Sequence, residues 1–350
     1  MSAIYHLLTE PELWAGLGAD GYRPARFAED GFVHCCADRA SALAVARDYF
    51  ADAPAPVWAL EVARAPLGRA LVFEAPAPLP GAATAHLATA ALFPHVYGPL
   101  GWRALRGAGR LARNGAGFEW PTRFAKLSAQ LAESVVARLR AREARGVPAL
   151  RAFRRELSRA LRAAPPRLVV ELASGLVANP GRGARLVASE LVRHHPGAVA
   201  ALRAPDVRRL AGTLAAWDDV DIFACMISGQ AYREGRITDA ELARWARSPD
   251  RWWRRAALVS TVPLNVRAQG GEGDARRTLR VCKLLVADRD DMVVKALSWA
   301  LRALAERDHA AVRRFVAARG ERLAARVRRE VGHKLRTGRK NPRRAERVAR

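Results

Sequence analysis

Cysteine is scarce in this sequence, and its four cysteines form none of the usual motifs. They stand at Cys35, Cys36, Cys225 and Cys282. This spacing contains no C-x-x-C pair and matches no metal-binding pattern, so no metal site is expected. The adjacent Cys35 and Cys36 are not expected to pair with each other, and a reducing cytoplasm fits the chain best.

Long apolar runs are also missing. No stretch of about eighteen or more apolar residues occurs, so neither a membrane span nor a membrane partner is expected. The first residues lack a basic segment followed by an apolar run, so no signal peptide is expected. Hydrophobic residues nevertheless make up 50% of the chain, which excludes a wholly disordered protein. At 350 residues the chain is long enough for two domains, each with its own core.

Lysine is absent from residues 1–120, and this part of the chain has almost no net charge. It contains ten arginines and eleven acidic residues, a net charge of −1. Residues 121–350 contain 49 basic and 23 acidic residues, a net charge of +26. So uneven a distribution indicates a polyanionic partner for the second part. The alternative is that the arginines only cover solvated helix faces, since basic patches also occur on proteins that bind no nucleic acid.

Residues 1–120 mix short strand patterns with turns. Residues 57–62 and 70–74 alternate as strands do, and a Pro-Leu-Gly turn separates them. Residues 38–50 have the pattern of a helix that begins with an acidic cap, and the proline-rich residues 75–81 are expected to form a loop. The first part is therefore predicted to be a small α+β domain.

From Lys126 onward the pattern is helical, broken by glycine and proline. Pairs of helices recur about every 35–45 residues, the period of HEAT-type repeats. We therefore expect a two-domain chain: a small α+β domain at 1–120, followed by an all-α HEAT-like helical-repeat solenoid at 121–336 with a basic concave groove. Residues 337–350 are expected to be a disordered basic tail that adds nonspecific affinity for nucleic acid.

Three motifs in the helical part combine a carboxylate, indole rings and guanidinium groups. The first is Trp217-Asp218-Asp219-Val220-Asp221, which opens a helix predicted over residues 218–232. The second is Trp252-Trp253-Arg254-Arg255-Ala256-Ala257-Leu258, and the third covers residues 294–302, with Lys295, Trp299 and Arg302. Such side chains are suited to holding a cationic base and the phosphates beside it.

With these motifs in this order, residues 125–340 resemble the AlkD-like DNA alkylation repair family. The resemblance implies a HEAT-repeat glycosylase of the DNA-3-methyladenine/7-alkylguanine type, which hydrolyses the N-glycosidic bond of cationic alkylated purines. It implies double-stranded DNA with alkylated bases as the partner, neither cofactor nor metal, and a location with the bacterial nucleoid. No obligate protein partner is evident. Helix–hairpin–helix and iron–sulfur cysteine patterns are missing from the sequence, which disfavours the common alternative glycosylase architecture.

The chemistry of such a reaction assigns roles to the motif residues. Breaking the glycosidic bond moves positive charge onto the deoxyribose, so Asp221 is the expected stabilising carboxylate and the group that orients water. Indole rings attract a cationic base, and the family pattern favours Arg255 over Arg254 as the clamp on a phosphate. The catalytic candidates are Asp221, Arg255 and Trp299, and the DNA-binding candidates are Trp217, Trp253, Arg254, Lys295 and Arg302.

Structural roles for the same residues remain open alternatives. Asp218 is expected to cap the helix that follows Trp217, Trp252 to lie in the core, and Arg254 to be an exposed helix charge. The helical part is alternatively a DNA-binding scaffold without catalysis. Whether a damaged nucleotide is flipped into a pocket or stays stacked in a distorted duplex is also open.

Residues 3–118 resemble a small bacterial domain family of unknown function. The similarity rests on Ile4-Tyr5-His6, Gly31-Phe32-Val33-His34-Cys35, Phe73-Glu74 and Phe93-Pro94-His95-Val96-Tyr97-Gly98-Pro99-Leu100. The family pattern has Ile and Ser where this chain has Val33 and Cys36. The second change replaces a hydroxyl by a thiol and so puts a hydroxyl contact in doubt.

The order of these elements also resembles the ADP-ribosyltransferase fold, which implies NAD as the ligand of the first domain. His6 would then bind a ribose hydroxyl, Tyr22 would stack on nicotinamide and Glu74 would stabilise the ribosyl cation. The candidate ligand site comprises His6, Tyr22, His34, Glu74, His95 and Tyr97. An NAD-dependent transferase is therefore a further alternative function. The competing interpretation is that the histidines make buried hydrogen bonds and Glu74 is a surface residue; their spacing matches no compact metal site.

Overall fold

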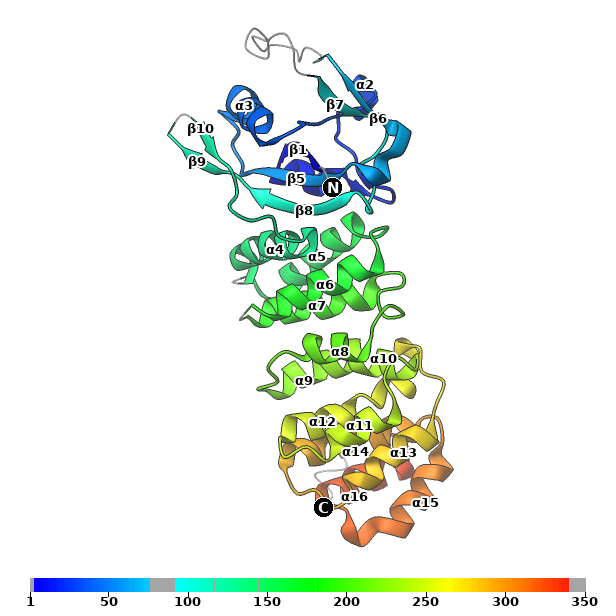
Figure 1. The fold of residues 1–350 in the computed structure, drawn as a ribbon. Helices are drawn as coiled ribbons and strands as arrows, with labels where there is room; N and C mark the ends of the chain where they lie inside the picture. The colour runs from blue at the N-terminus through cyan, green and yellow to red at the C-terminus, as the bar shows by residue number, and fades with distance from the viewer. Residues whose placement is uncertain (1–2, 76–91, 116, 144, 180, 340–350) are drawn as a thin grey trace. The chain divides into compact units, whose positions relative to one another are not determined.

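The computed structural model describes residues 3–75, 92–115, 117–143, 145–179 and 181–339 (Figure 1). The chain divides into two compact units, Met1–Leu176 and Val177–Arg350. Among the described residues, strands occur only up to Glu119 and every later element is a helix, so the predicted fold class, α+β followed by all-α, is confirmed. The predicted domain boundary at residue 120 marks this change of secondary structure, whereas the compact units divide within the helical part.

Two three-stranded antiparallel sheets form the strand-rich part of the first unit. One has the order β1-β5-β8 and the other β4-β7-β6, and two short hairpins pair β2 with β3 and β9 with β10. The strands are β1 (Ala3–Thr9), β2 (Leu17–Gly18), β3 (Gly21–Tyr22), β4 (Val33–His34), β5 (Val57–Ala63), β6 (Leu71–Glu74), β7 (Phe93–Val96), β8 (Leu105–Arg110), β9 (Ala112–Asn114) and β10 (Gly117–Glu119). Apolar side chains between these strands and the helices form the core, with Ile4, Leu8 and Leu60 almost fully buried.

Local sequence signals set most of these elements. The expected helix at 38–50 is α3 (Arg39–Phe50), and Asp38 caps it by accepting a hydrogen bond from the Ser41 amide at 2.8 Å. The expected strands correspond to β5 and β6, with a short 3-10 helix (Ala65–Ala70) between them. Most of the expected loop at 75–81 lies outside the described residues. Two further short helices, α1 (Glu10–Gly16) and α2 (Phe27–Asp30), complete this part.

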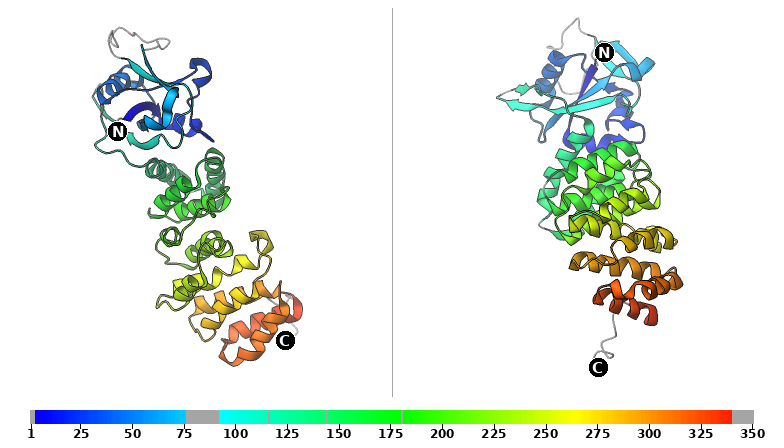
Figure 2. Two further views of the ribbon diagram at one scale, coloured as in Figure 1. Left: turned by 45° about the vertical axis from the view of Figure 1, so that its right-hand side comes forward. Right: turned by 60° about the horizontal axis from the view of Figure 1, so that its bottom comes forward.

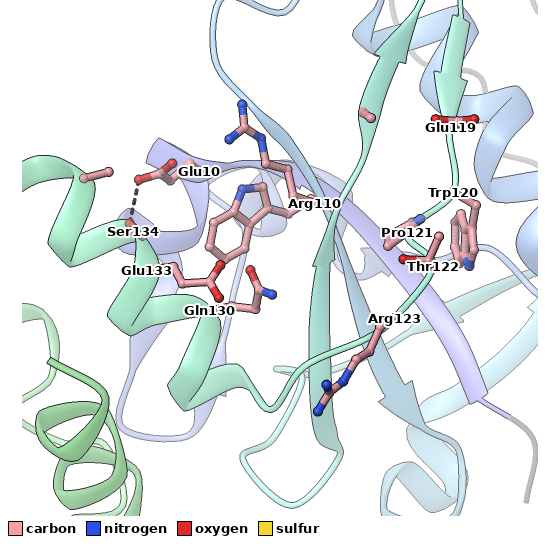
Figure 3. A pocket seen from close by; sticks show the side chains of 13 residues that line it. Glu10, Arg110, Glu119, Trp120, Pro121, Thr122, Arg123, Gln130, Glu133 and Ser134 are labelled. Atoms are coloured by element: carbon pink, nitrogen blue, oxygen red, sulfur yellow. Dashed lines mark hydrogen bonds between the residues drawn. The ribbon is translucent and has the colours of Figure 1, made fainter. Parts of the chain in front are cut away.

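Three helices of the first unit follow the strands: α4 (Leu127–Glu143), α5 (Gly146–Ala160) and α6 (Pro166–Val177). Helix α4 packs against β8 and α5. Ser134 of α4 accepts a hydrogen bond from the Trp14 indole at 2.9 Å. Beside it lies an open hollow of about 390 Å³ lined by Glu10, Arg110 and Glu133 among others (Figure 3). None of the predicted site residues lines this hollow.

The second unit is helical, and neighbouring helices pack closely on one another (Figures 1 and 2). Its α-helices are α7 (Arg182–His194), α8 (Ala204–Ala211), α9 (Trp217–Phe223), α10 (Gly229–Arg233), α11 (Asp239–Ala246), α12 (Arg251–Val259), α13 (Ala275–Leu284), α14 (Asp291–Ala305), α15 (His309–Arg319) and α16 (Ala325–Thr337). The closest packing joins α11 to α12, α12 to α14, and α14 to α16. This brings the second and third sequence motifs onto adjoining helices.

The ends of the helices follow the predicted breaks. Pro166 is the first residue of α6 and Pro205 the second of α8, positions where a missing amide hydrogen costs no helical bond. Helix α16 ends at Thr337, and Gly338 follows in the left-handed conformation. The rest of the expected tail, residues 340–350, lies outside the described residues. No helix in the described ranges has the length and apolar character that crossing a bilayer requires.

Candidate functional site

The first motif begins α9, and the helix predicted over residues 218–232 is present in three segments. Helix α9 (Trp217–Phe223) continues into a π-helical segment (Ala224–Ser228) and then into α10 (Gly229–Arg233). A π-helical segment inserts an extra residue into the helical repeat and is frequent at functional sites. Here it begins three residues after Asp221.

The cap of this helix differs from the prediction. The expectation that Asp218 is the N-cap is wrong, because Ala216 takes the cap position with an extended backbone. Asp218 lies in the first turn, where its charge is favourable beside the helix N-terminus. Its neighbour Asp219 pairs with Arg185 at 3.1 Å, so a long-range ion pair, absent from any local pattern, helps to hold the start of the helix.

Asp221 and Arg255 form a two-pronged ion pair between α9 and α12. The Arg255 Nε donates to Asp221 Oδ1 at 3.0 Å, and Nη2 donates to Oδ2 at 2.8 Å. The Arg255 side chain is only 6% exposed and that of Asp221 is 18% exposed. A third bond runs from Arg255 Nη1 to the Met292 carbonyl at 2.6 Å, at the start of α14. Arg255 therefore joins the first and second motifs and contacts the first turn of α14, the helix that carries the third motif.

The electrostatics of Asp221 are set by two opposing effects. Burial raises the pKa of this carboxyl above its ordinary value, and the nearby Asp218 adds to the rise. Hydrogen bonding and charge attraction from Arg255 oppose it. The result is a carboxylate that is fixed in direction, partly shielded from water and more easily protonated than an exposed aspartate.

Arg255 was predicted to clamp a phosphate, but the structure places it against Asp221. Three of its five N–H groups donate to atoms of its own unit. Its direct geometric role is to orient the carboxylate and to tie α9 and α12 to the backbone of α14. A contact between Arg255 and a phosphate stays a prediction. Only the two remaining N–H groups of Arg255 could make this contact.

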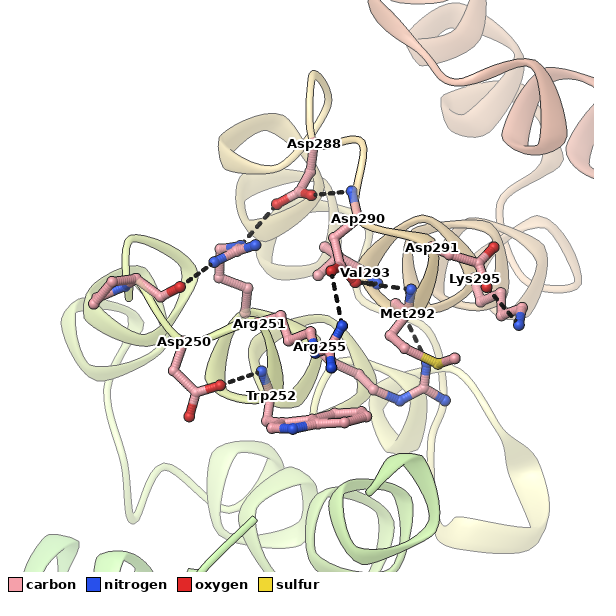
Figure 4. A network of polar contacts seen from close by, with 12 residues as sticks. Asp250, Arg251, Trp252, Arg255, Asp288, Asp290, Asp291, Met292, Val293 and Lys295 are labelled. Atoms are coloured by element: carbon pink, nitrogen blue, oxygen red, sulfur yellow. Dashed lines mark hydrogen bonds and ion pairs between the residues drawn. The ribbon is translucent and has the colours of Figure 1, made fainter. Parts of the chain in front are cut away.

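Arg254 lies on the same helix and is held by the loops around it. Figure 4 shows the network of polar contacts in which Asp288, Asp290 and Arg255 take part. Its Nε donates to Asp288 Oδ2 at 2.8 Å, and its Nη1 donates to the carbonyls of Ser248 and Pro249 at 3.1 and 2.8 Å. The side chain is 20% exposed. It is therefore not the exposed helix charge of the alternative interpretation, and its bonds favour a role in joining loops over DNA contact.

Replacing Arg254 by Ala is expected to lower the free energy of unfolding by about 1–3 kcal/mol, because Asp288 and two carbonyls lose their donors. Urea denaturation measures this change. The control is Arg251→Ala on the same helix: its side chain is 54% exposed and its ion pair with Asp290 spans 3.5 Å, so a loss below about 1 kcal/mol is expected. Unchanged stability with weakened DNA binding in Arg254→Ala would instead support a DNA contact.

The tryptophans of the motifs occupy different environments. Trp217 is exposed over 54% of its surface, and lies one helical turn before Asp221, on the same face of α9. Trp253 is half-buried and packs on Trp245 with ring centroids 5.0 Å apart. Trp299 is half-buried on α14, and Trp252 is half-buried with the Arg251 guanidinium 5.0 Å from its ring. Trp217 is thus the indole most open to a ligand, and Trp252, which was expected in the core, is only half-buried.

Lys295 and Arg302 both lie on α14 but differ in exposure. Lys295 pairs with Asp291 at 2.7 Å and is 42% exposed, so it remains open to solvent. The Arg302 Nε donates to Ser298 Oγ at 3.2 Å beside Glu330, and the side chain is 15% exposed. Burial lowers the pKa of Arg302. The geometry therefore suits Lys295 for DNA contact better than Arg302.

Several residues of the site escaped the sequence analysis. The Met292 carbonyl, Asp288 and Glu330 each bind a predicted arginine or its neighbour. The Asp-Arg-Asp run at residues 288–290 could have been recognised in the sequence as the start of a helix. Asp290 caps α14 by accepting a hydrogen bond from the Met292 amide at 2.9 Å. A backbone carbonyl has no residue type, so nothing in the sequence marks the Met292 contact.

In the first unit the structure brings the six predicted ligand-site residues into one region. A cavity is lined by His6, Tyr22, His34 and His95, among others. Glu74 Oε1 binds His95 Nδ1 at 2.8 Å and accepts from the Tyr97 hydroxyl at 2.7 Å.

The details of this region agree with parts of both interpretations. Hydrogen bonds from Tyr97 and His95 hold the pKa of the Glu74 carboxyl below its usual range. His95 is buried and makes the expected hydrogen bond, and Glu74 is a partly exposed strand residue, as the structural alternative holds. Among the described residues no group of His, Cys, Asp and Glu could hold a metal ion.

Comparison with known proteins identifies both parts of the chain. A family model described as "DNA alkylation repair enzyme" matches residues 135–335. This is more than half of the chain, which therefore belongs to the DNA alkylation repair enzyme family. A model described as "Protein of unknown function (DUF952)" matches residues 8–108. Both resemblances drawn from the motifs are confirmed, and the chain is a DNA repair enzyme.

Similar solved structures exist for each part. A crystal structure of a Caulobacter crescentus protein is 27% identical, covering 33% of this chain and 92% of that one with a TM-score of 0.27. A double mutant of the same protein is 26% identical over the same shares, also with a TM-score of 0.27. A structure described as a predicted DNA alkylation repair enzyme from Enterococcus faecalis is 18% identical, covering 54% of this chain and 86% of that one with a TM-score of 0.43. No curated protein matches the chain.

Proposed function

We propose that the chain is a DNA glycosylase that binds duplex DNA through its basic helical part and hydrolyses the N-glycosidic bond of purines alkylated at N3 or N7. The observation that carries the proposal is the Asp221 carboxylate, aligned by the buried Arg255 and only partly exposed to solvent. An exposed indole, Trp217, stands one turn away on the same helix. Residues 121–350 supply a net charge of +26 for the DNA backbone.

The chemistry of the substrate explains why one carboxylate suffices. An alkylated purine carries a positive charge, so it leaves with the bonding electron pair as a neutral base and needs no general acid. As the bond to C1′ breaks, positive charge develops on the sugar, and a fixed negative charge stabilises that transition state. The oxygen of a water molecule then bonds to C1′, and Asp221 is placed to accept the proton that this water loses.

The ion pair with Arg255 leaves Asp221 able both to stabilise the sugar cation and to accept a proton from water. Each carboxylate oxygen accepts one N–H from Arg255 and keeps lone-pair capacity for a water or for the sugar. Because the guanidinium is fixed by a third bond to the Met292 carbonyl, the carboxylate does not have to reorient as charge develops. Such preorganisation is the main source of electrostatic catalysis.

DNA contact is supported by the surroundings of Trp253. This residue borders a shallow hollow whose other walls include Arg208, Arg244 and Arg247. Arginines beside an aromatic ring suit phosphate and base contacts. Two of them also pair with Glu241, which leaves part of their hydrogen-bonding capacity for a backbone phosphate.

The experiment that tests the function is release of free base from duplex DNA containing N7-methylguanine or N3-methyladenine, followed by chromatography, with an undamaged duplex as the control. The proposal expects lesion-dependent base release by the full chain. Tight, salt-sensitive binding of either duplex with no base release would contradict it. That result would support the alternative of a DNA-binding scaffold without catalysis.

The pH dependence of base release is expected to follow the ionisation of Asp221. The pKa of Asp221 is raised, so its carboxylate takes up a proton at a higher pH than an exposed aspartate does. The ordinary pKa of an exposed aspartate is about 3.9. Activity should therefore fall as the pH is lowered, with a midpoint above that value. Single-turnover rates of base release, measured over a range of pH and corrected for uncatalysed depurination, test this fall in activity. Rates that stay constant down to the ordinary aspartate value would speak against this assignment.

A further inference from the structure

The cavity of the first unit has an aromatic interior that the glycosylase function does not use. Its volume is about 380 Å³, within the range of pockets that hold small ligands. Tyr22, Tyr49, Phe50 and Phe93 contribute rings to its walls. Such walls favour a flat aromatic ligand.

His6 provides a polar group in this cavity that no described residue satisfies. The ring is 7% exposed, and its Nδ1 lies 2.7 Å from the His34 carbonyl. A carbonyl only accepts, so Nδ1 carries the proton and Nε2 is left as an acceptor. Nε2 is buried without a hydrogen-bond partner among the described residues. Burial lowers the pKa of His6 to about 4, so this acceptor persists at neutral pH.

A buried acceptor without a partner is costly and uncommon in proteins. A ligand that brings a hydroxyl or an N–H group to Nε2 would remove this cost. The nearest ring is that of Tyr22, with its centroid 5.2 Å from the centroid of His6. The hydrogen-bonding atom and an aromatic surface are therefore adjacent, which is the arrangement needed for a ring that carries a hydroxylated substituent.

The charges around the cavity disfavour a phosphate. Glu12 and Asp30 are acidic, and Arg26 is the only Lys or Arg among the described lining residues. Arg26 already pairs with Asp30 at 3.3 Å and with Glu29 at 3.7 Å. A phosphate would thus meet two carboxylates and a guanidinium that is already neutralised.

The two thiols that line the cavity are not anions either. Burial raises the pKa of Cys36 to about 12 and holds the pKa of Cys35 well above its usual range. Both stay protonated near neutral pH and act as small apolar surfaces. The thiols therefore add no charge to the aromatic part of the cavity.

We propose that this cavity binds a nucleoside, with the heteroaromatic ring against the aromatic walls and a sugar hydroxyl donating to His6 Nε2. The occupant carries no phosphate. This separates the site from the NAD expected by analogy, because a dinucleotide brings two phosphates that the described walls do not neutralise. The proposal is independent of the glycosylase site, which lies in the other compact unit.

The test is isothermal titration calorimetry of the full chain with adenosine, 2′-deoxyadenosine, 2′,3′-dideoxyadenosine, adenosine 5′-monophosphate and NAD. We expect adenosine to bind, and the monophosphate and NAD to bind at least about tenfold more weakly because of charge repulsion. Loss of the donating hydroxyl should weaken binding about five- to tenfold. The deoxy series also shows which hydroxyl donates and whether the site takes ribonucleosides or deoxyribonucleosides.

Variants then assign the hydroxyl contact to His6. In His6→Leu the discrimination between adenosine and dideoxyadenosine should disappear, whereas His309→Leu, a change of the same type in the other compact unit, should keep it. Asp221→Asn should bind adenosine like the unaltered chain. A failure of the glycosylase proposal can therefore be told apart from a failure of the nucleoside proposal. Absence of binding by any nucleoside, tighter binding of NAD than of adenosine, or unchanged discrimination in folded His6→Leu would each overturn the inference. If His6→Leu does not fold, binding of the deoxy series to the unaltered chain still shows whether a sugar hydroxyl contributes to binding.

Discussion

Asp221→Asn is expected to lower the single-turnover rate of N7-methylguanine release from duplex DNA about 100- to 1,000-fold, the usual cost of losing one transition-state charge contact. The amide has nearly the shape of the carboxylate, so Arg255 keeps one acceptor and the helices stay in place. What is lost is the negative charge opposite the developing sugar cation and the acceptor for the proton of water. Affinity for the damaged duplex should remain, or rise, because a negative charge near the phosphates is gone.

The matched control for this change is Asp291→Asn. Asp291 lies in the same unit at the start of α14, is 58% exposed and pairs with Lys295 and Arg326. Removing its charge changes the net charge by the same amount without touching the pair with Arg255. Its rate is expected to stay within about threefold of the unaltered chain, because an exposed ion pair contributes little. Equal losses in both variants would show that Asp221 acts only through general charge and would remove its catalytic assignment.

Arg255→Ala is expected to have the second large effect, here on stability as well as on rate. Breaking a buried ion pair by removing one partner costs about 3–5 kcal/mol, because the remaining charge is left without compensation. The Met292 carbonyl also loses its donor. Urea denaturation measures the loss of stability, and base release at a temperature where the variant is folded measures the rate.

Arg255→Lys separates charge from geometry. Lysine keeps the positive charge but cannot donate to both carboxylate oxygens in one plane. We expect it to recover part of the stability and little of the rate. In Arg255→Ala the opposing effect of the guanidinium on the pKa of Asp221 is gone, so the acid limb of activity should move to higher pH. Full activity in Arg255→Lys would contradict an orienting role for the guanidinium.

The fold was predictable where local pattern and tertiary structure agree. Asp38 and the residues after it have a strong capping and helical signal, and α3 forms there. The loss of strand pattern after residue 120 coincides with the last described strand, β10. Such features depend on residues near one another in sequence, and propensity and capping act at that range.

The sequence named residues that the structure brings together at the candidate site, but it did not predict how they contact one another. The carboxylate of Asp221 and the guanidinium of Arg255 were both singled out, yet their pairing across 34 residues follows from the packing of α9 on α12. Arg254 and Arg255 are neighbours with the same chemistry, and adjacent helix positions point in different directions. One therefore meets Asp221, and the other meets Asp288.

The cap of α9 shows the same limit. Asp218 has the residue type and position of an N-cap, yet Ala216 occupies the cap. The ion pair between Asp219 and Arg185 links this turn to α7, so tertiary contact outweighed a local preference worth only about 1 kcal/mol. The exposed Trp217 and the half-buried Trp253 likewise have identical chemistry and different surroundings.

By itself the sequence determined the class of each part, the segregation of charge, the family motifs and the residue types available for chemistry, because these depend on composition and on short-range periodicity. Only the tertiary structure decided which arginine holds the carboxylate, which tryptophan faces solvent, and that His6, Tyr22, His34 and His95 gather around one aromatic cavity with an unsatisfied acceptor. Those outcomes depend on contacts between residues far apart in the chain, where packing and burial select among side chains that are chemically alike.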